Sequence, residues 1–182
     1  SCGSFLSFPG AREVGVEFNS LSKTYGLAGA RIGFCLGNRE VVAQLKRLKS
    51  NMDYGMFLPI QQAAIAAITG DQSCVERTRE AYVRRRNCLC DGFTAIGWPM
   101  ERPAATMFVW AAIPSGYETS EAFAMDLVEK AGLIVTPGSA FGPSGEGYVR
   151  LALVQDEDAI RQAVDLVAVS GILSGGKSKV GR

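Results

Sequence analysis

A short stretch near the start of the chain combines an amine, a guanidinium and two hydroxyls around a glycine-containing turn. It reads Ser20-Leu-Ser-Lys-Thr-Tyr-Gly-Leu-Ala-Gly-Ala-Arg-Ile-Gly33. The amine of Lys23 could condense with an aldehyde, because an unprotonated lysine attacks carbonyl carbon. The hydroxyls of Ser20 and Ser22 and the fork of Arg31 could hold a phosphate dianion. These residue types at this spacing favour a site for a molecule that carries both a carbonyl and a phosphate.

A second candidate is the arginine in the run Tyr148-Val-Arg-Leu-Ala-Leu153. Strand alternation puts Arg150 on the opposite face from Val149 and Leu151. A guanidinium held in mid-strand among apolar neighbours needs an anionic partner, and its planar fork suits a carboxylate. Taken alone, the residue indicates either an ion pair inside the protein, which is the commoner arrangement, or a binding site for a carboxylate.

Both stretches resemble one known family. The first is similar to the lysine signature of the fold-type I pyridoxal-phosphate enzymes, aminotransferase class I/II, written Ser-x-Ser-Lys followed by Gly-x-Arg-x-Gly, and it fills every fixed position. The loop Pro137-Gly-Ser-Ala-Phe141, ahead of the arginine strand, resembles the small-domain pattern of the same enzymes. Two matches so far apart in the sequence make an accidental likeness less plausible than one short motif would.

The resemblance implies a role for each candidate residue. The cofactor would be pyridoxal 5'-phosphate, bound by Ser20, Ser22, Lys23 and Arg31. Lys23 would be the catalytic lysine, and Arg150 would bind the α-carboxylate of the substrate. Tyr54 falls in a region that, in the family, reaches across a homodimer towards the neighbouring site, so we expect it to contact substrate.

The resemblance implies an aminotransferase that moves an amino group between an L-amino acid and a 2-oxo acid, acting as a homodimer. The run Gly145-Glu-Gly-Tyr-Val-Arg150 looks most like the LL-diaminopimelate and aspartate aminotransferase subgroups. Gly26-Leu-Ala-Gly29 is closer to histidinol-phosphate and broad-specificity aspartate-type members, so the donor and acceptor stay open. A lyase or decarboxylase that uses the same lysine, and a non-catalytic structural domain, stay open as well.

The family pattern also implies the fold class, which is α/β: the C-terminal part of the pyridoxal-phosphate-dependent transferase fold. We expect the end of the large cofactor domain at residues 1–58, connecting helices at 59–97, a small α/β domain at 98–170 and a frayed tail at 171–182. In the family, the groups that contact the cofactor ring lie upstream of the lysine strand, and only a short segment precedes Lys23. We therefore expect the C-terminal half of a longer enzyme, inactive alone.

Local patterns indicate the elements that position these residues. Strands are expected at residues 14–18, 32–36, 106–113, 133–136 and 148–154. Helix-start signals stand at Asn38, Pro59, Thr119 and Asp156, and at a capping box formed by Ser73 and Glu76. The strand at 14–18 and the helix at 60–69 are apolar enough to be buried, whereas the run Arg84-Arg-Arg86 should be a solvated helix face.

Composition limits the partners. The 182 residues are 47% apolar and 20% charged with a net charge of +1, which favours an ordinary globular protein and implies neither nucleic acid nor a membrane surface. Five cysteines, an odd number without zinc spacing, suit reduced thiols in a cytoplasmic protein. Histidine is absent, which removes His-based triads and most zinc chemistry, so we expect no metal.

Overall fold

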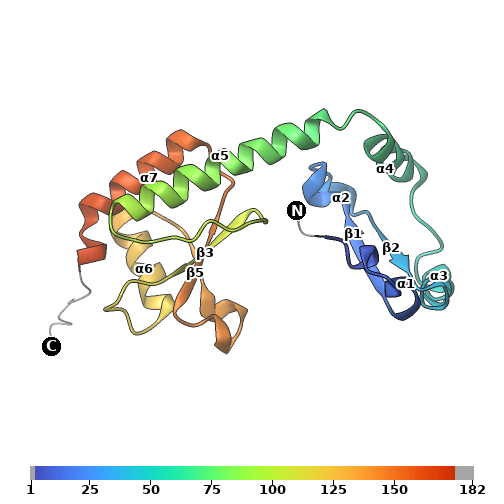
Figure 1. Cartoon of the computed structure of the whole chain (residues 1–182), viewed down its shortest axis with the longest axis horizontal. Coiled ribbons are helices and arrows are strands. Elements are labelled where there is room, and N and C mark those ends of the chain that lie inside the picture. Colours follow the sequence, from blue (N-terminus) through green and yellow to red (C-terminus); the bar gives the residue numbers. More distant parts are fainter. Residues whose placement is uncertain (1–2, 175–182) are drawn as a thin grey trace. The chain divides into compact units, whose positions relative to one another are not determined.

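The computed structural model describes residues 3–174 (Figure 1). The chain forms two compact units, which divide between Arg79 and Glu80 within helix α5 (Ser73–Ala95). The domain boundaries expected at residues 58 and 97 stay predictions. Most of the expected tail, from residue 175 onward, lies outside the described residues. Within its first residues, the short 3-10 helix η5 (Ile172–Ser174) buries Ile172 in the core, so this part of the tail is packed rather than frayed.

The first unit is built on a pair of antiparallel strands. Its elements are η1 (Phe5–Ser7), α1 (Ala11–Val14), β1 (Val16–Ser20), α2 (Leu21–Thr24), η2 (Ala28–Ala30), β2 (Gly33–Gly37), α3 (Arg39–Met52) and α4 (Leu58–Thr69). In the register of the pair, Val16 lies opposite Gly37 and Ser20 opposite Gly33. The end of β1 and the start of β2 therefore meet at one end of this sheet.

Burial in the first unit differs from expectation. Within residues 3–79, the buried apolar side chains are Ala11, Leu21 and Ala64. The strand expected to be buried starts two residues later and leaves Phe18 72% exposed, and helix α4 buries only Ala64. Both predictions of burial were wrong for this chain, because apolar composition requires a covering layer that these residues do not themselves supply.

The second unit contains a three-stranded antiparallel sheet in the order β3-β5-β4. Its elements after α5 are β3 (Phe108–Ala112), α6 (Ser120–Ala131), β4 (Thr136–Pro137), η3 (Gly138–Phe141), η4 (Pro143–Gly145), β5 (Tyr148–Ala152), α7 (Glu157–Ser170) and η5. Trp110 pairs with Arg150 across β3 and β5, and Thr136 pairs with Arg150 across β4 and β5. Arg150 is therefore the central residue of the central strand.

One face of this sheet packs into the main core. Val109, Val149 and Leu151 are almost fully buried and join side chains of α5, α6 and α7 in one cluster. Trp98 lies in the same cluster, 1% exposed, with its indole N–H donating to the carbonyl of Ala112 at 2.7 Å. Trp110, on the opposite face, is 40% exposed. The sheet thus has one packed and one open face.

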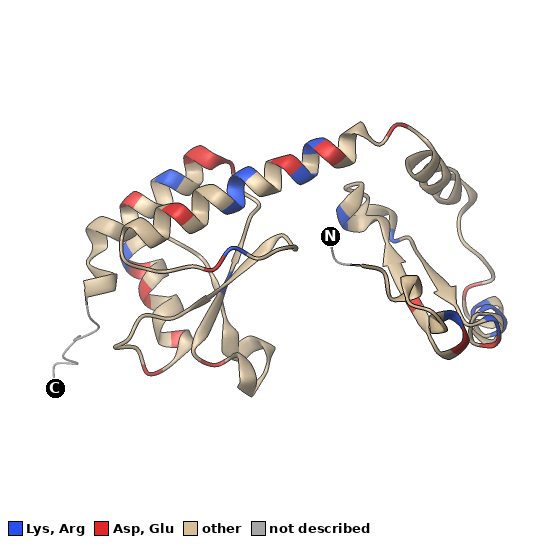
Figure 2. Ribbon diagram, viewed as in Figure 1, with Lys and Arg blue, Asp and Glu red and all other residues tan. Residues whose placement is uncertain are grey.

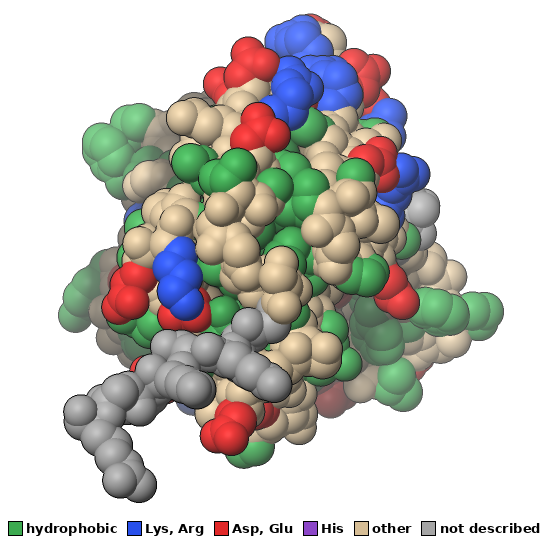
Figure 3. Space-filling model, turned by 90° about the vertical axis from the view of Figure 1, so that its left-hand side faces the viewer, with side chains coloured by type: hydrophobic (Ala, Val, Ile, Leu, Met, Phe, Trp, Pro, Cys, Tyr) green, Lys and Arg blue, Asp and Glu red, His purple; other side chains and the backbone are tan. Residues whose placement is uncertain are grey.

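Charged residues concentrate on the helices, whereas the strands of both units contain few of them (Figure 2). On the face of the molecule in Figure 3, acidic and basic side chains adjoin one another and apolar groups lie between them.

Within residues 3–174, no helix is both long enough and apolar enough to cross a membrane. The same residues contain no group of three or more His, Cys, Asp or Glu placed to hold a metal ion.

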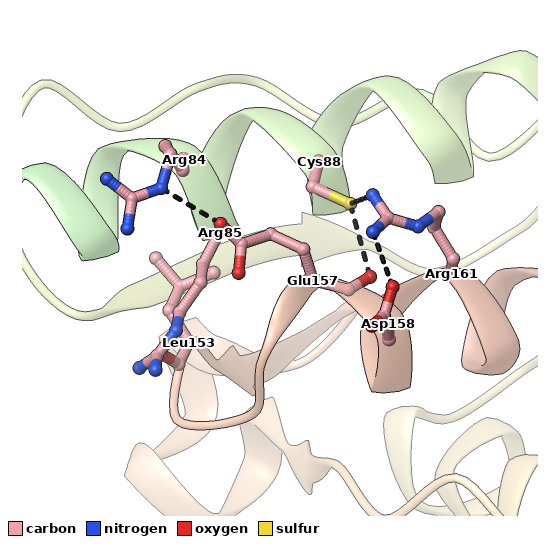
Figure 4. A network of polar contacts seen from close by, with 7 residues as sticks. All are labelled: Arg84, Arg85, Cys88, Leu153, Glu157, Asp158 and Arg161. Atoms are coloured by element: carbon pink, nitrogen blue, oxygen red, sulfur yellow. Dashed lines mark hydrogen bonds and ion pairs between the residues drawn. The ribbon is translucent and has the colours of Figure 1, made fainter.

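The three consecutive arginines of α5 have three different environments, and Figure 4 shows those of Arg84 and Arg85. Arg84 is exposed and pairs with Glu157 of α7 at 3.0 Å. Arg85 is half-buried and donates to the carbonyl of Leu153 at 3.3 Å, while Arg86 donates to that of Pro103 at 3.0 Å. The prediction of a solvated face was wrong for Arg85 and Arg86, because successive helical residues point about 100° apart.

Several helix caps match the sequence signals. Asn38, Thr119 and Asp156 are N-caps whose side chains accept backbone N–H groups of the first turn. The prediction of a capping box at Ser73 was wrong. Ser73 is the first residue of α5, and its backbone N–H donates to the Asp71 carboxylate at 3.0 Å. The acidic residue two positions upstream takes the role of the cap.

Candidate cofactor and carboxylate sites

The two serine hydroxyls next to Lys23 are held by hydrogen bonds within their own turn. Ser20 ends β1 and caps α2, where its Oγ accepts the N–H of Ser22 at 3.2 Å. The Ser20 hydroxyl in turn donates to the Ser22 Oγ at 3.0 Å. Extended backbone at Ser20 followed at once by a helical turn is the geometry that an N-cap serine requires. Both hydroxyls therefore lie at the junction of strand and turn.

Lys23 extends from α2 into solvent. Buried Leu21 anchors the turn, because its N–H donates to the carbonyl of Ile32 at 3.4 Å and its own carbonyl accepts the N–H of Tyr25 at 3.3 Å. Within residues 3–174, no carboxylate or carbonyl accepts a hydrogen bond from the Lys23 amine or pairs with it. The amine is therefore free to react with a small molecule.

Arg31 lies just ahead of β2 and returns the chain to the same junction. It takes a left-handed conformation with φ of 52°, and its guanidinium donates to the carbonyl of Ala28 at 2.9 Å. Gly33, two residues on, lies opposite Ser20 in the sheet, and a Cβ there would be 2.6 Å from the carbonyl oxygen of Asn19. The glycine lets the strands meet closely, which brings Arg31 to the end of the sheet where the serines lie.

This set of donors fits a phosphorylated aldehyde. Two hydroxyls and a guanidinium are strong hydrogen-bond donors for a phosphate dianion, and within the described part of the chain none of them bonds to a carboxylate that would compete. The nearby lysine amine suits an aldehyde. The residue types and their common place at one sheet end support the cofactor that the sequence implies.

Tyr54 occupies a separate loop of the first unit, between α3 and α4. Its backbone has φ of 55°, and its side chain is 94% exposed. The preceding residue, Asp53, is tied back to Lys49 by an ion pair. A tyrosine in the left-handed region is uncommon, and such strain is often found at functional positions.

Arg150 lies on the open face of the second unit's sheet. Its guanidinium carbon is 4.2 Å from the ring centre of Phe108 and 4.5 Å from that of Phe141. Among residues 3–174 no carboxylate pairs with it, so the internal ion pair that its sequence allowed does not form within this part of the chain. The guanidinium keeps its hydrogen-bond donors for an outside anion.

Phe141 belongs to a loop that two polar residues fasten. The Glu146 carboxylate accepts the N–H of Ser120 at 2.6 Å and that of Gly147 at 2.8 Å. The Gly147 N–H, followed by the Ser120 N–H, holds the pKa of the Glu146 carboxyl below its ordinary range. The Ser120 hydroxyl, fully buried, accepts the N–H of Ser139 at 3.3 Å. The start of α6 and the loop around Phe141 are thereby joined.

Sequence reasoning missed Phe108 and Phe141, and it missed the contacts of Glu146 with Ser120. The alternation of Phe108 and Trp110 with buried Val109 could have placed the rings of Phe108 and Trp110 on Arg150's side of the sheet, once β3 was paired with β5 in register. The Glu146 contact joins residues 26 positions apart, and no local pattern signals it.

Comparison with known proteins shows the family of the chain. The family model for aminotransferase class I and II matches residues 9–167, so the chain belongs to that family. The expected α/β fold class, the pyridoxal-phosphate-dependent transferase fold, is confirmed by its solved relatives.

Individual relatives are closely similar. The chain is 47% identical over 162 residues to an LL-diaminopimelate aminotransferase of Moorella thermoacetica, which covers 89% of this chain and 41% of the relative. It is 50% identical over 163 residues to the glutamate-pyruvate aminotransferase AlaC of Escherichia coli K12, covering 88% and 40%. Substrate-bound BacF from Bacillus subtilis superposes with a TM-score of 0.86 at 36% identity, covering 91% of this chain and 42% of that one. The chain spans about two fifths of the length of these relatives.

Proposed function

We propose that this chain forms part of an aminotransferase that transfers an amino group between an L-amino acid and a 2-oxo acid with pyridoxal 5'-phosphate. The observation that carries the proposal is the turn at Lys23, where an exposed lysine follows two serine hydroxyls at the end of the sheet that Arg31 also adjoins. Membership of the aminotransferase family and the names of the close relatives support the same reaction.

Each proposed role follows from the chemistry of its side chain. When bound, pyridoxal phosphate supplies an aldehyde that a lysine amine can attach to and a ring that accepts electrons from the substrate. Lys23 holds the cofactor and, once displaced by the amino donor, takes the proton from the substrate Cα. Ser20, Ser22 and Arg31 bind the phosphate, and Arg150 binds the α-carboxylate through its paired N–H groups.

Two further roles belong to the complete enzyme. Tyr54, strained and almost fully exposed, contacts the substrate in the neighbouring site of a homodimer.

A cytoplasmic location fits the four cysteines of the described residues, all of which are free thiols. In this proposal the catalytic assembly requires chain beyond these 182 residues, so the 182-residue chain alone should transfer no amino groups.

Borohydride reduction tests the central role. The complete enzyme that carries this chain is incubated with pyridoxal phosphate, reduced, digested and mapped by mass spectrometry. We expect the reduced adduct on Lys23 both in the wild type and in the matched control variant Lys46→Ala, because Lys46 of α3 is merely another exposed lysine. An adduct on a different lysine, with Lys23 unmodified, would refute the assignment.

Product analysis separates transfer from other reactions of the same cofactor. The enzyme is given an amino donor and a 2-oxo acid, and both products are measured. Stoichiometric appearance of the new amino acid and the new 2-oxo acid supports transamination. Release of carbon dioxide, or of a cleaved side chain, would instead assign a decarboxylase or a lyase.

A further inference from the structure

The guanidinium of Arg150 is contacted by aromatic rings rather than by a carboxylate of the described residues. Phe108 lies on the same face of β3, diagonal to Arg150 across the pair of strands, and its ring centre is 4.2 Å from the guanidinium carbon. Phe141 approaches from the loop before β5, with its ring centre at 4.5 Å. A guanidinium at these distances is attracted to the negative face of the ring. Within residues 3–174 no acceptor takes a hydrogen bond from the guanidinium, so its N–H groups stay available to a ligand while the rings contact it.

The rings are themselves held in place. Trp110 touches the ring of Phe141 edge-on at 5.5 Å between centres. The loop that carries Phe141 is closed by Gly138 and Gly145, whose backbones pass so near that a Cβ on Gly138 would lie 1.9 Å from the Gly145 carbonyl oxygen. The Glu146 carboxylate and the Ser120 hydroxyl fasten the same loop to α6. Phe141 is therefore fixed although its side chain is 50% exposed.

An arginine side chain packed between two rings has lost much of its rotamer freedom before any ligand binds. A free arginine side chain samples many rotamers, and ordering it on binding reduces affinity. An internal carboxylate would also order it, but would occupy the donors that a ligand needs. Two apolar rings restrict the side chain and leave its donors unoccupied.

We propose that Phe108 and Phe141 are positioning residues that hold Arg150 ready for the carboxylate of the amino acid substrate. This inference rests on the proposed function of Arg150 as the α-carboxylate ligand. It assigns to the loop at residues 137–147 a purpose in binding, namely to carry one of the two rings. The rings themselves do not touch the substrate's reacting atoms in this proposal.

Kinetics on the complete enzyme form the first test. Phe108→Leu and Phe141→Leu each remove one ring, and Phe141→Tyr keeps it. We expect both leucine variants to raise the KM of the amino donor and the inhibition constant of propionate about tenfold, with kcat within about twofold of wild type. Phe141→Tyr should behave like wild type, because the ring face is retained.

Tyr148→Leu is the matched control. Tyr148 lies on the same open face and is 40% exposed, but its ring stacks on Trp110 at 5.7 Å. This variant should leave both constants unchanged. Propionamide, which lacks the negative charge, should inhibit all variants equally. Equal loss of propionate and propionamide binding, or the same loss in Tyr148→Leu, would overturn the positioning role.

The second test uses the 182-residue chain and needs no catalysis. Protons over an aromatic face are shielded, so the Nε–H resonance of Arg150, identified by its loss in Arg150→Lys, should lie upfield and move downfield in Phe141→Leu. Acetate should shift this resonance at about tenfold lower concentration in wild type than in either leucine variant. Absence of amino transfer by the wild-type enzyme would count against the proposed function alone. Equal acetate affinity in wild type and both variants would refute positioning by the rings.

Discussion

The carboxylate-binding role proposed for Arg150 depends on the shape of its side chain as well as on its charge. A guanidinium offers two parallel N–H donors to a carboxylate, whereas a lysine ammonium is a point charge on a flexible stem. The flat group also fits over the rings of Phe108 and Phe141. The arrangement therefore predicts that charge alone will not substitute for the guanidinium.

Arg150→Lys in the complete enzyme tests this expectation. We expect kcat/KM for the amino donor to fall about 100-fold, since a charge-assisted bidentate contact becomes a single one. Steady-state kinetics measure the change, and Arg84→Lys, an exposed arginine paired with Glu157, is the control. Wild-type efficiency in Arg150→Lys would contradict a carboxylate role for this residue.

At single positions, the sequence was informative where chemistry follows from residue type. Lys23, Ser20 and Ser22 stand next to one another in sequence, so their common turn could be predicted directly. The environment of Arg150 could not, because Phe108 is 42 positions and Phe141 nine positions away, and their approach depends on strand register and loop path.

Among the elements, the loop before β5 is the most tightly constrained. Gly138 and Gly145 face one another with no room for a side chain. In Gly138→Ala we expect the second unit to lose about 3 kcal/mol of unfolding free energy, because backbone, unlike a flexible side chain, cannot move aside cheaply. Urea denaturation measures the loss. Ala140→Ser, an exposed position in the same loop, should change stability by no more than about 0.5 kcal/mol, and equal stability of both variants would contradict the close contact.

Glu146 makes the stability of this loop depend on pH. Its pKa is lowered in the folded state by the N–H groups of Gly147 and Ser120, so the carboxylate stabilises the fold at neutral pH. That contribution is lost as the pH falls below the ordinary value of 4.5 through the lowered pKa. Glu146→Gln should therefore be less stable than wild type at pH 7, and the difference should shrink in acid. Urea midpoints between pH 7 and pH 3 test the prediction, and a constant difference would contradict it.

Helix ends were easier to predict than strand ends. Asn38, Thr119 and Asp156 cap helices through their own side chains, which the local sequence contains in full. The strand expected at residues 133–136 shrank to Thr136–Pro137, because the N–H of Leu133 donates to the Leu127 carbonyl and closes the end of α6. Strand boundaries depend on which partner takes each N–H, and that partner is often distant in sequence.

For the molecule as a whole, the core is unevenly distributed. Almost all strongly buried apolar side chains described belong to residues 80–174, whereas residues 3–79 leave Phe18, Phe57 and Ile65 more than half exposed. Burial of apolar surface is the main source of stability, so the two units should differ in protection.

Hydrogen exchange on the intact chain tests this difference. We expect amides of β3, β5 and α7 to exchange slowest and to reflect global unfolding, and amides of β1 and β2 to exchange at least about 100-fold faster. Mass spectrometry of peptic peptides resolves the two groups. Comparable protection of β1 and Val149 would show that the first unit is stabilised by contacts other than those described.

The two tryptophans give the second unit a pair of built-in optical reporters. Trp98, enclosed by Phe93 and Phe123 at ring-centre distances of 5.1 and 5.0 Å, should emit at short wavelength and respond only when the core opens. Trp110, beside the ring that contacts Arg150, should emit at longer wavelength and change when an anion settles there. Replacing either one with phenylalanine would leave a single emitter. The variant that keeps Trp98 would then report the integrity of the fold, and the variant that keeps Trp110 would report occupancy of the open face.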